Sequence, residues 1–362
     1  MDQEEDFGRY VSALAQTLGH ADRVEPLGDY CRGLMLSGER KSVEPMAALI
    51  APRRVSAKHQ SLHHFVAKAQ WSDAALLEAV RAEVLPTIGE IEAWIVDDTG
   101  YPKKGKHSVG VTRQYCGQLG KQDNCQVAVS LSVANARGSL PIDYRLYLPR
   151  EWAADAARRT KAEVPASVVF ATKTAISLEQ LQRARAAHVP AGVVLADAGY
   201  GNDAGFRDGV AALGLTYAVG IQSSTTVWAE GHEPLPPRGQ SGRGRPGVHL
   251  RRDQTHQPID ANALAHELPG RAWRRVQWRE GSKGALVSRF ARIRVRAAHR
   301  NEVRPEEWLV IEWPLGETEP IKYWLTTLPE KIALNELIRV IKLRWRIERD
   351  YQELKQDRKS VV

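Results

Sequence analysis

Two short apolar runs in this chain of 362 residues each lead into aspartate, with glycine close behind. Residues 93–96 (AWIV) precede Asp97 and Asp98, and residues 193–196 (VVLA) precede Asp197. Runs of this length and composition indicate buried strands, and the nearby glycines let the backbone turn sharply at their ends. Each aspartate could simply accept hydrogen bonds from loop amides, or the carboxylates could form part of a charged site. The sequence therefore predicts two buried strands that each carry an aspartate at the carboxyl end.

The chain up to residue 88 has the pattern of a helical domain. Ser42, and Ser72 together with Asp73, are placed as N-terminal caps of two of its helices. His63 and His64 are adjacent, so on a helix they diverge by about 100° and are better suited to a helix surface or to DNA contacts than to one metal ion. The predicted helices span residues 9–19, 44–52, 59–70 and 72–86.

From residue 89 the pattern changes to strands separated by Gly, Pro and Asn turns, followed by alternating helices and strands. Strands are expected at 92–98, 124–135 and 140–148 as a meander, then a helix at 177–188, a strand within 191–201, a helix at 204–214 and a strand at 215–221. Further strands are expected at 292–298, 308–313 and 322–327, and one long helix from 333 to about 356. This order predicts a mixed α/β (α+β) fold.

Composition indicates a cytoplasmic protein that does not enter a membrane. Hydrophobic residues make up 43% and charged residues 26% of the chain, and its apolar runs fall short of the roughly 20 residues of a membrane span. The N-terminus is acidic and polar, unlike a signal peptide. Three sparse cysteines fit a reducing compartment and lack the spacing of a zinc site.

The positive charge of the chain is concentrated in one segment. The formal net charge is +8, and residues 221–304 carry sixteen Lys and Arg against seven Asp and Glu, so the remainder is close to neutral. The segment includes GQSGRGRPG at 239–247 and RFARIRVRAAHR at 289–300, with Trp273 and Trp278 between them. Such a segment is either a solvated charged face or a surface for nucleic acid, which gains affinity by releasing phosphate counterions.

A third carboxylate is predicted on the closing helix. At about 100° per residue, Val340, Leu343, Ile347, Tyr351 and Leu354 form one apolar stripe, and Arg344, Glu348 and Lys355 border it. Glu348 is therefore expected to lie along the protein's own surface. The alternative is an exposed ion pair between Arg344 and Glu348, four residues apart.

A strand Asp, a later strand Asp and a late helix Glu on this plan resemble the ribonuclease H-like DDE transposases of bacterial insertion sequences. Their closing signature, Tyr-x2-Arg-x3-Glu-x6-Lys, is similar to Ile341-x2-Arg344-x3-Glu348-x6-Lys355 here. DDTGYPKKGKHSVGVTRQYCGQLGKQDNCQVAVSLSV, at 97–133, and HQSLHHFVAKAQW, at 59–71, resemble the insertion sequence 701 type within the larger insertion sequence 4-like group. The sequence departs from the family pattern at two places. Ile341 stands where the signature has Tyr, and the sequence ends seven residues after Lys355.

The resemblance implies a helical N-terminal DNA-binding domain over residues 1–88. A ribonuclease H-like mixed-sheet catalytic domain would follow over 89–362, with a basic β-rich insertion at about 221–325. It implies a transposase that cuts DNA at terminal inverted repeats and joins the ends to target DNA, as a nucleoid-associated homodimer. Asp97, Asp197 and Glu348 would be the catalytic ligands of two Mg²⁺ or Mn²⁺ ions, which favour oxygen ligands. DNA phosphates would be contacted by Arg344, Lys355, Lys103, Lys104, Arg292, Arg294 and Arg296.

Several alternatives stay open on the sequence alone. Consecutive strand residues point to opposite faces, so either Asp97 or Asp98 could be the first metal ligand, and the resemblance favours Asp97. The lysines near residue 103 could merely be solvated. The chain could also be a C-terminally truncated, inactive DNA-binding remnant, or a metal-dependent nuclease without strand transfer.

Overall fold

The computed structural model describes residues 3–37, 41–237, 249–281 and 284–356. The chain divides into two compact units. The first comprises residues 1–90, 137–143 and 345–362, and the second comprises 91–136 and 144–344. The basic motif at 239–247 lies outside the described residues. In the described part, no helix is long and apolar enough to cross a membrane.

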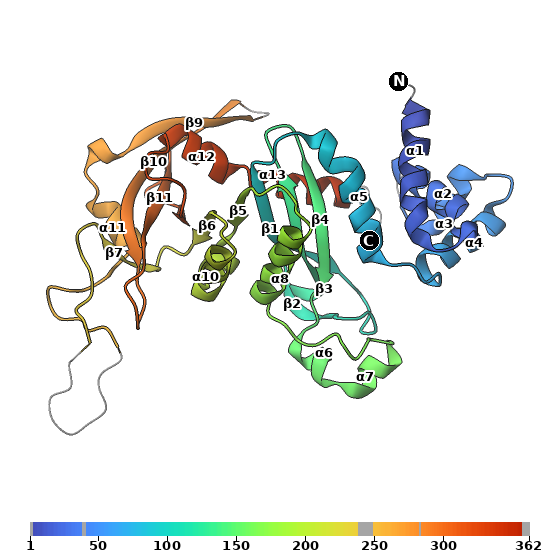
Figure 1. Ribbon diagram of the computed structural model, residues 1–362, viewed down its shortest axis with the longest axis horizontal. Coiled ribbons are helices and arrows are strands. Elements are labelled where there is room, and N and C mark those ends of the chain that lie inside the picture. Colours follow the sequence, from blue (N-terminus) through green and yellow to red (C-terminus); the bar gives the residue numbers. More distant parts are fainter. Residues whose placement is uncertain (1–2, 38–40, 238–248, 282–283, 357–362) are drawn as a thin grey trace. The chain divides into compact units, whose positions relative to one another are not determined.

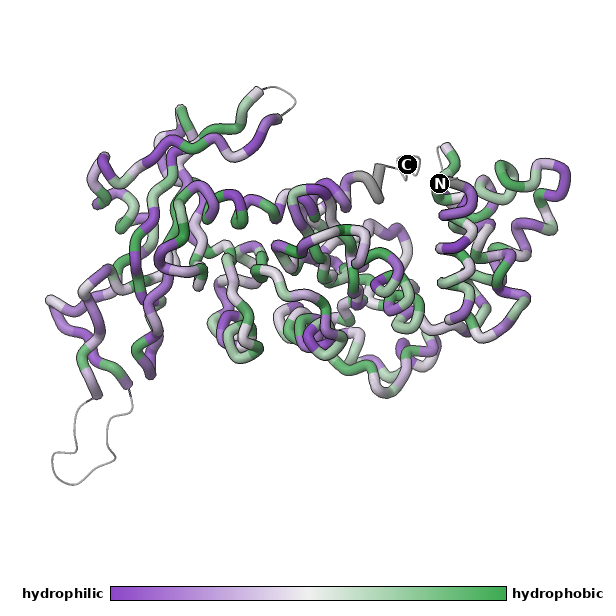
Figure 2. Tube along the Cα trace, turned by 45° about the horizontal axis from the view of Figure 1, so that its top comes forward, coloured by the Kyte–Doolittle hydropathy of each residue, from purple (hydrophilic) through white to green (hydrophobic). Residues whose placement is uncertain are grey.

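The first unit is helical (Figure 1). Its helices are α1 (Gln3–Ala15), α2 (Val24–Met35), α3 (Val43–Ile50), α4 (Val55–Ala67), α5 (Asp73–Ile88) and α13 (Trp345–Gln356), with short 3₁₀ turns η1 (Gln16–Leu18) and η2 (Ala21–Arg23). Apolar and polar stretches alternate along the helices, as amphipathic packing requires (Figure 2). One core cluster consists of Val11, Leu14, Leu18, Leu27 and Phe65.

One of the two predicted helix caps in this unit is confirmed, and the other is wrong. The Ser72 hydroxyl accepts a hydrogen bond from the Ala75 N–H at 3.2 Å, as predicted for the start of α5. Ser42 stands at the N-cap position of α3, but its side chain makes no capping hydrogen bond.

Helix α2 is not predicted by the sequence pattern, because Pro26, Gly28 and Gly33 lie within it. Proline is tolerated in the first turn of a helix, where its missing N–H has no partner to lose. Gly33 has a packing role, since a Cβ there would be 3.1 Å from both Ile50 Cδ1 and Met46 Cγ. Close packing between α2 and α3 therefore explains a glycine that resembles a helix breaker in the sequence.

The second unit is built on a mixed sheet whose described strands run in the order β2, β3, β1, β5, β6, β12, β11, β10, β7, β8. The strands of its first half are β1 (Ala93–Pro102), β2 (Thr112–Cys116), β3 (Lys121–Ala134), β5 (Val193–Ala196) and β6 (Tyr217–Ile221). Strand β1 pairs antiparallel with β3 and parallel with β5, and β5 pairs parallel with β6. β4 (Ser139–Leu146) runs from the first unit into the second.

Helices accompany the parallel strands. α8 (Lys173–Ala186) packs on β3, where the Gln180 side chain donates to the Val129 carbonyl at 3.1 Å, and α10 (Ala204–Ala212) packs beside α8 (Figure 1). Shorter helices are α6 (Arg150–Ala154), α7 (Ala156–Lys161) and α9 (Ala198–Gly201). The strand and helix order after residue 89 follows the predicted order, with β2, α6 and α7 added.

The segment between β6 and the last helices continues the sheet. It contains β7 (Thr226–Ala229), β8 (Ile259–Asp260), α11 (Ala261–Glu267), a 3₁₀ turn η3 (Gly270–Ala272), β9 (Arg274–Gly281), β10 (Gly284–Ala297), β11 (Glu306–Pro314) and β12 (Lys322–Thr326). Strands β9 to β12 pair antiparallel, and β12 pairs with β6. This basic segment is thus β-rich, as the sequence predicts.

The single long helix predicted from residue 333 is wrong. α12 (Leu334–Lys342) ends at a turn formed by Leu343 and Arg344, and α13 begins at Trp345. The turn contains neither glycine nor proline, so helix propensity gives no signal for it. The single helical wheel used to place Arg344 and Glu348 on one face therefore does not apply.

Candidate active site

The two predicted aspartates come together, although only Asp197 stands at a strand end. Asp197 follows the last residue of β5, whereas β1 continues past Asp97 to Pro102, so the prediction that β1 ends at its aspartates is wrong. Ile95 of β1 is in register with Leu195 of β5, so continuing both strands sets Asp97 beside Asp197. Residues in register on adjacent parallel strands point to the same face of the sheet. The parallel pairing of β1 with β5 therefore brings the carboxylates of Asp97 and Asp197 together.

Asp97 is a buried carboxylate at the centre of this pair. It is 9% exposed, and its Oδ1 accepts a hydrogen bond from the Asp98 backbone N–H at 2.9 Å. Burial raises the pKa of Asp97 to about 6; the positive charge of Arg344 opposes this rise and the negative charge of Asp197 adds to it. Asp97 is therefore harder to ionise than an exposed aspartate, because the charge of Arg344 does not fully offset its burial.

Asp197 is more open and caps a short helix. Its Oδ1 accepts a hydrogen bond from the Gly199 N–H at 2.9 Å, and its side chain is 48% exposed. The turn of α9 that follows packs directly on β6, because a Cβ at Gly201 would lie 2.0 Å from the Gly220 carbonyl oxygen. Glycine at 201 is therefore required for the close approach that holds Asp197 at the strand end.

Arg344 bridges the two aspartates. Its Nη2 lies 3.1 Å from Asp97 Oδ1 and 3.7 Å from Asp197 Oδ2. The side chains of Arg344 and Asp97 are 21% and 12% exposed, so much of this ion pair is shielded from water. Arg344 reaches the pair from the turn after α12, the position at which the predicted helix breaks.

The end of α12 is fixed by a lysine enclosed in the β-rich segment. The Lys342 ammonium lies 2.6 Å from Glu312 Oε2 and 4.2 Å, 5.4 Å and 5.3 Å from the ring centroids of Trp278, Phe290 and Trp324. The side chains of Lys342 and Glu312 are only 10% and 5% exposed. We refer to Lys342, Glu312 and the three aromatic residues as the Lys342 cage. Sequence reasoning missed it, because it forms only when distant strands meet.

Asp98 has different partners from Asp97. Its Oδ2 lies 3.0 Å from Lys173 Nζ, at the start of α8, and accepts a hydrogen bond from the Tyr200 hydroxyl at 3.3 Å. Burial, followed by the charge of Asp98, raises the pKa of the Tyr200 phenol. Sequence reasoning missed both Lys173 and Tyr200 as site residues, although Tyr200 lies only three residues after Asp197.

Glu348 belongs to the first unit, on α13, and its side chain is exposed. Its meeting with Asp97 and Asp197 stays a prediction. Lys355 lies on the same helix, with its side chain outside the described part. Over residues 3–37, 41–237, 249–281 and 284–356, no group of three or more His, Cys, Asp or Glu side chains is arranged to hold a metal ion.

The predicted phosphate-binding residues fall into two groups. Lys103 and Lys104 are exposed immediately after β1. Arg292, Arg294 and Arg296 are half-buried on β10 and already bond within the protein, to the carbonyls of Ile332, Glu306 and Arg304 at 2.5 Å, 2.8 Å and 2.9 Å. The first two also stack over Trp308.

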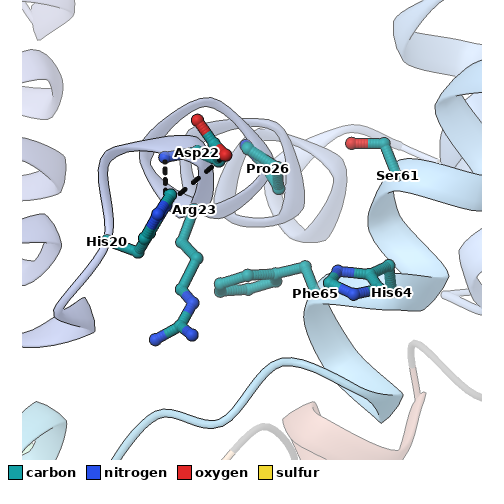
Figure 3. A pocket seen from close by; sticks show the side chains of 7 residues that line it. All are labelled: His20, Asp22, Arg23, Pro26, Ser61, His64 and Phe65. Atoms are coloured by element: carbon teal, nitrogen blue, oxygen red, sulfur yellow. Dashed lines mark hydrogen bonds and ion pairs between the residues drawn. The ribbon is translucent and has the colours of Figure 1, made fainter.

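The first unit contains a surface pocket of about 350 Å³. Figure 3 shows Phe65 between the segment of His20 and Arg23 on one side and His64 on the other, with Ser61 and Pro26 above it. Asp22 contacts His20 through an ion pair of 3.4 Å. His64, considered above as a surface or DNA-contacting residue, thus lines a concave surface.

In this mixed sheet Asp97 of β1 lies beside Asp197, which directly follows the parallel strand β5, and β1 pairs antiparallel with β3 on its other side. This is the ribonuclease H-like architecture that the sequence predicted. The profile of the DDE superfamily endonucleases matches residues 13–285, and the chain belongs to that family. Endonucleases of this superfamily depend on divalent metal ions.

The chain is also similar to the probable transposase for insertion sequence element IS701 from Microchaete diplosiphon. The two are 32% identical over 171 residues, which is 46% of this chain and 42% of the relative. The match thus spans less than half the length of the curated relative. The family prediction is confirmed.

Proposed function

We propose that this protein is the transposase of an insertion sequence, which cuts DNA at the terminal inverted repeats and transfers the cut strands into target DNA. The observation that carries the proposal is the pair of aspartates, Asp97 and Asp197, on neighbouring parallel strands and in contact with one shared cation, in a DDE superfamily endonuclease. The similarity to an insertion-sequence transposase supports strand transfer in addition to cleavage.

The two aspartates fit a divalent metal ion. They offer hard oxygen ligands from two rigid strands, and both lie within 4 Å of the same guanidinium nitrogen, so their negative charges already converge on one cation. We propose that Asp97, Asp197 and Glu348 hold two Mg²⁺ or Mn²⁺ ions. Such ions supply a deprotonated nucleophile and stabilise the leaving oxygen of a phosphodiester.

Other residues of the site are proposed to bind and orient DNA. Asp98 is bonded to Lys173 and Tyr200, which supports Asp97 as the first metal ligand. Lys103, Lys104, Arg344 and Lys355 would contact phosphates near the cut, and Arg292, Arg294 and Arg296 would extend this surface over the insertion at 221–325. The helical domain at 1–88, with its pocket lined by Arg23 and His64, would bind the element ends. We propose a homodimer in the DNA complex, in the bacterial cytoplasm.

The test is incubation of the purified protein with Mg²⁺ and a DNA fragment that carries the element's own end. Products joined to target DNA would support the transposase. A gel shift without cleavage would indicate a DNA-binding remnant, and cleavage without joining or end specificity would indicate a simple nuclease.

A matched pair of variants makes this test specific. Asp197→Asn should abolish cleavage, because an amide keeps the helix cap but removes the charge that a metal ion needs. Asp203→Asn is the control. Asp203 also caps a helix, α10, where it accepts a hydrogen bond from the Phe206 N–H at 3.2 Å. Equal loss of cleavage in both variants would show that the effect is not specific to the charge of Asp197.

A further inference from the structure

Arg344 occupies the position between the two aspartates that a bound cation would share. One nitrogen, Nη2, lies within 4 Å of a carboxylate oxygen of each aspartate. Two carboxylates on neighbouring strands repel one another, and the repulsion is strong where one of them is buried. Arg344 therefore contributes the positive charge that lets Asp97 and Asp197 sit together.

We propose that Arg344 is a resident counter-cation that competes with the divalent metal ion for Asp97 and Asp197 and must leave them when the metal binds. The inference rests on the proposed function, because it assumes that these two aspartates hold the metal. It assigns Arg344 a positioning role before metal binding, in addition to the phosphate contact proposed above. Once the metal ion displaces the Arg344 guanidinium from the aspartates, the guanidinium can contact a DNA phosphate. Phosphate contact would therefore follow metal binding.

The structure explains why Arg344 is directed at this pair. Lys342, two residues earlier, is anchored in its cage by Glu312 and three aromatic rings. The helix stops at this anchor, and the turn of Leu343 and Arg344 then leads to α13. The open side of the pair is Asp197, whose side chain is 48% exposed, so a metal ion from solvent can approach there.

The inference is tested by measuring Mn²⁺ binding to the full-length protein without DNA, by titration calorimetry. Arg344→Gln removes the competing charge and should raise Mn²⁺ affinity by about 5- to 150-fold, the usual range of a coupling between two bound groups. Arg344→Lys keeps a point charge but loses the paired donors of the guanidinium, so its affinity should rise by less. Arg339→Gln is the control, because Arg339 lies on α12, shortly before the turn of Arg344, and pairs with Glu336 at 2.7 Å.

A second readout separates competition from general damage. In EDTA, Arg344→Gln should melt at a lower temperature than the unchanged protein, since the aspartates then repel without compensation. Mn²⁺ should raise its melting temperature by more than it raises that of the unchanged protein, because the gain follows affinity. If Arg344→Gln does not fold, Arg344→Lys carries the same comparison.

The outcomes separate this inference from the proposed function. Tighter Mn²⁺ binding in the Arg344 variants, with Arg339→Gln unchanged, supports the inference. Equal or weaker binding in those variants overturns it and leaves the metal site of the proposed function standing. Absence of Mn²⁺ binding in every folded form, the unchanged protein included, overturns both.

Discussion

Replacing Asp97 with asparagine should stabilise the metal-free protein above about pH 6. Asp97 is buried beside another carboxylate, and these surroundings raise its pKa from 3.8 to about 6 despite the attraction of Arg344. A carboxyl whose pKa is raised on folding disfavours the folded state once it ionises. Asparagine has a similar size and carries no charge, so it removes this penalty.

The size of the effect follows from the pKa shift. One pKa unit corresponds to 1.36 kcal/mol, so a rise from 3.8 to about 6 corresponds to about 3 kcal/mol. Below pH 3.8 the carboxyl is protonated in both states and contributes nothing. Between these two pKa values the unfolded chain ionises first, so the free energy of unfolding falls as pH rises. Above about pH 6 the full penalty applies to the unchanged protein and not to the variant.

The assay is urea unfolding in EDTA at a series of pH values from about 4 to 8, followed by circular dichroism. The difference in unfolding free energy between Asp97→Asn and the unchanged protein should grow by about 3 kcal/mol across this range. Asp208→Asn is a control whose difference should stay nearly constant over this range, because the Arg304 guanidinium lowers the pKa of Asp208 below 3.8 and its stabilisation is lost only at lower pH. A difference for Asp97→Asn that does not change with pH would refute the reasoning.

Two further predictions concern the β-rich segment. Lys342→Met should cost about 3 to 5 kcal/mol of stability, because it leaves Glu312 buried without its partner, and the double variant Lys342→Met with Glu312→Gln should recover much of the loss in urea unfolding. Neutralising three arginines of β10 should lower DNA affinity and flatten its salt dependence by roughly 0.9 log unit for each phosphate that the variant no longer binds. If the salt dependence does not change, Arg292, Arg294 and Arg296 make only their bonds within the protein and do not contact phosphates.

The fold is largely predictable because its signals are local. Continuous apolar runs locate β1 and β5, and the aspartates are recognisable because each comes directly after such a run. The expected turn at Gly100 is wrong, because Gly100 pairs with Val127 inside β1 and approaches Cys116 too closely for a side chain. The register of β1 with β5 is a property of strand pairing that the sequence does not predict.

The parts that are not predictable depend on contacts between distant residues. Leu343 and Arg344 have good helix propensity, yet the helix stops there, beside the Lys342 cage and the aspartate pair. Gly33 has the low helix propensity of a helix breaker, although it lets α2 approach Met46 and Ile50. In both cases tertiary packing overrides local propensity, and a single sequence carries no record of that packing.

The central claim is that Asp97, Asp197 and Glu348 form one metal-dependent cleavage site. Glu348 provides its most direct test, because its meeting with the two aspartates is a prediction. Glu348→Gln keeps the size of the side chain and removes its charge. The direct measurement is the rate of Mg²⁺-dependent cleavage of DNA carrying the element's end, together with DNA affinity and melting temperature. Glu336→Gln is the matched control, because Glu336 is exposed on α12 and pairs with Arg339.

The account predicts that Glu348→Gln lowers the cleavage rate by several orders of magnitude while DNA binding and melting temperature change little. Glu336→Gln should cleave at the normal rate. If Glu348 were only an exposed helix residue in an ion pair, its replacement would cost about 0.3 to 0.5 kcal/mol of stability and leave cleavage intact. Full cleavage by Glu348→Gln would contradict the claim that α13 supplies the third metal ligand.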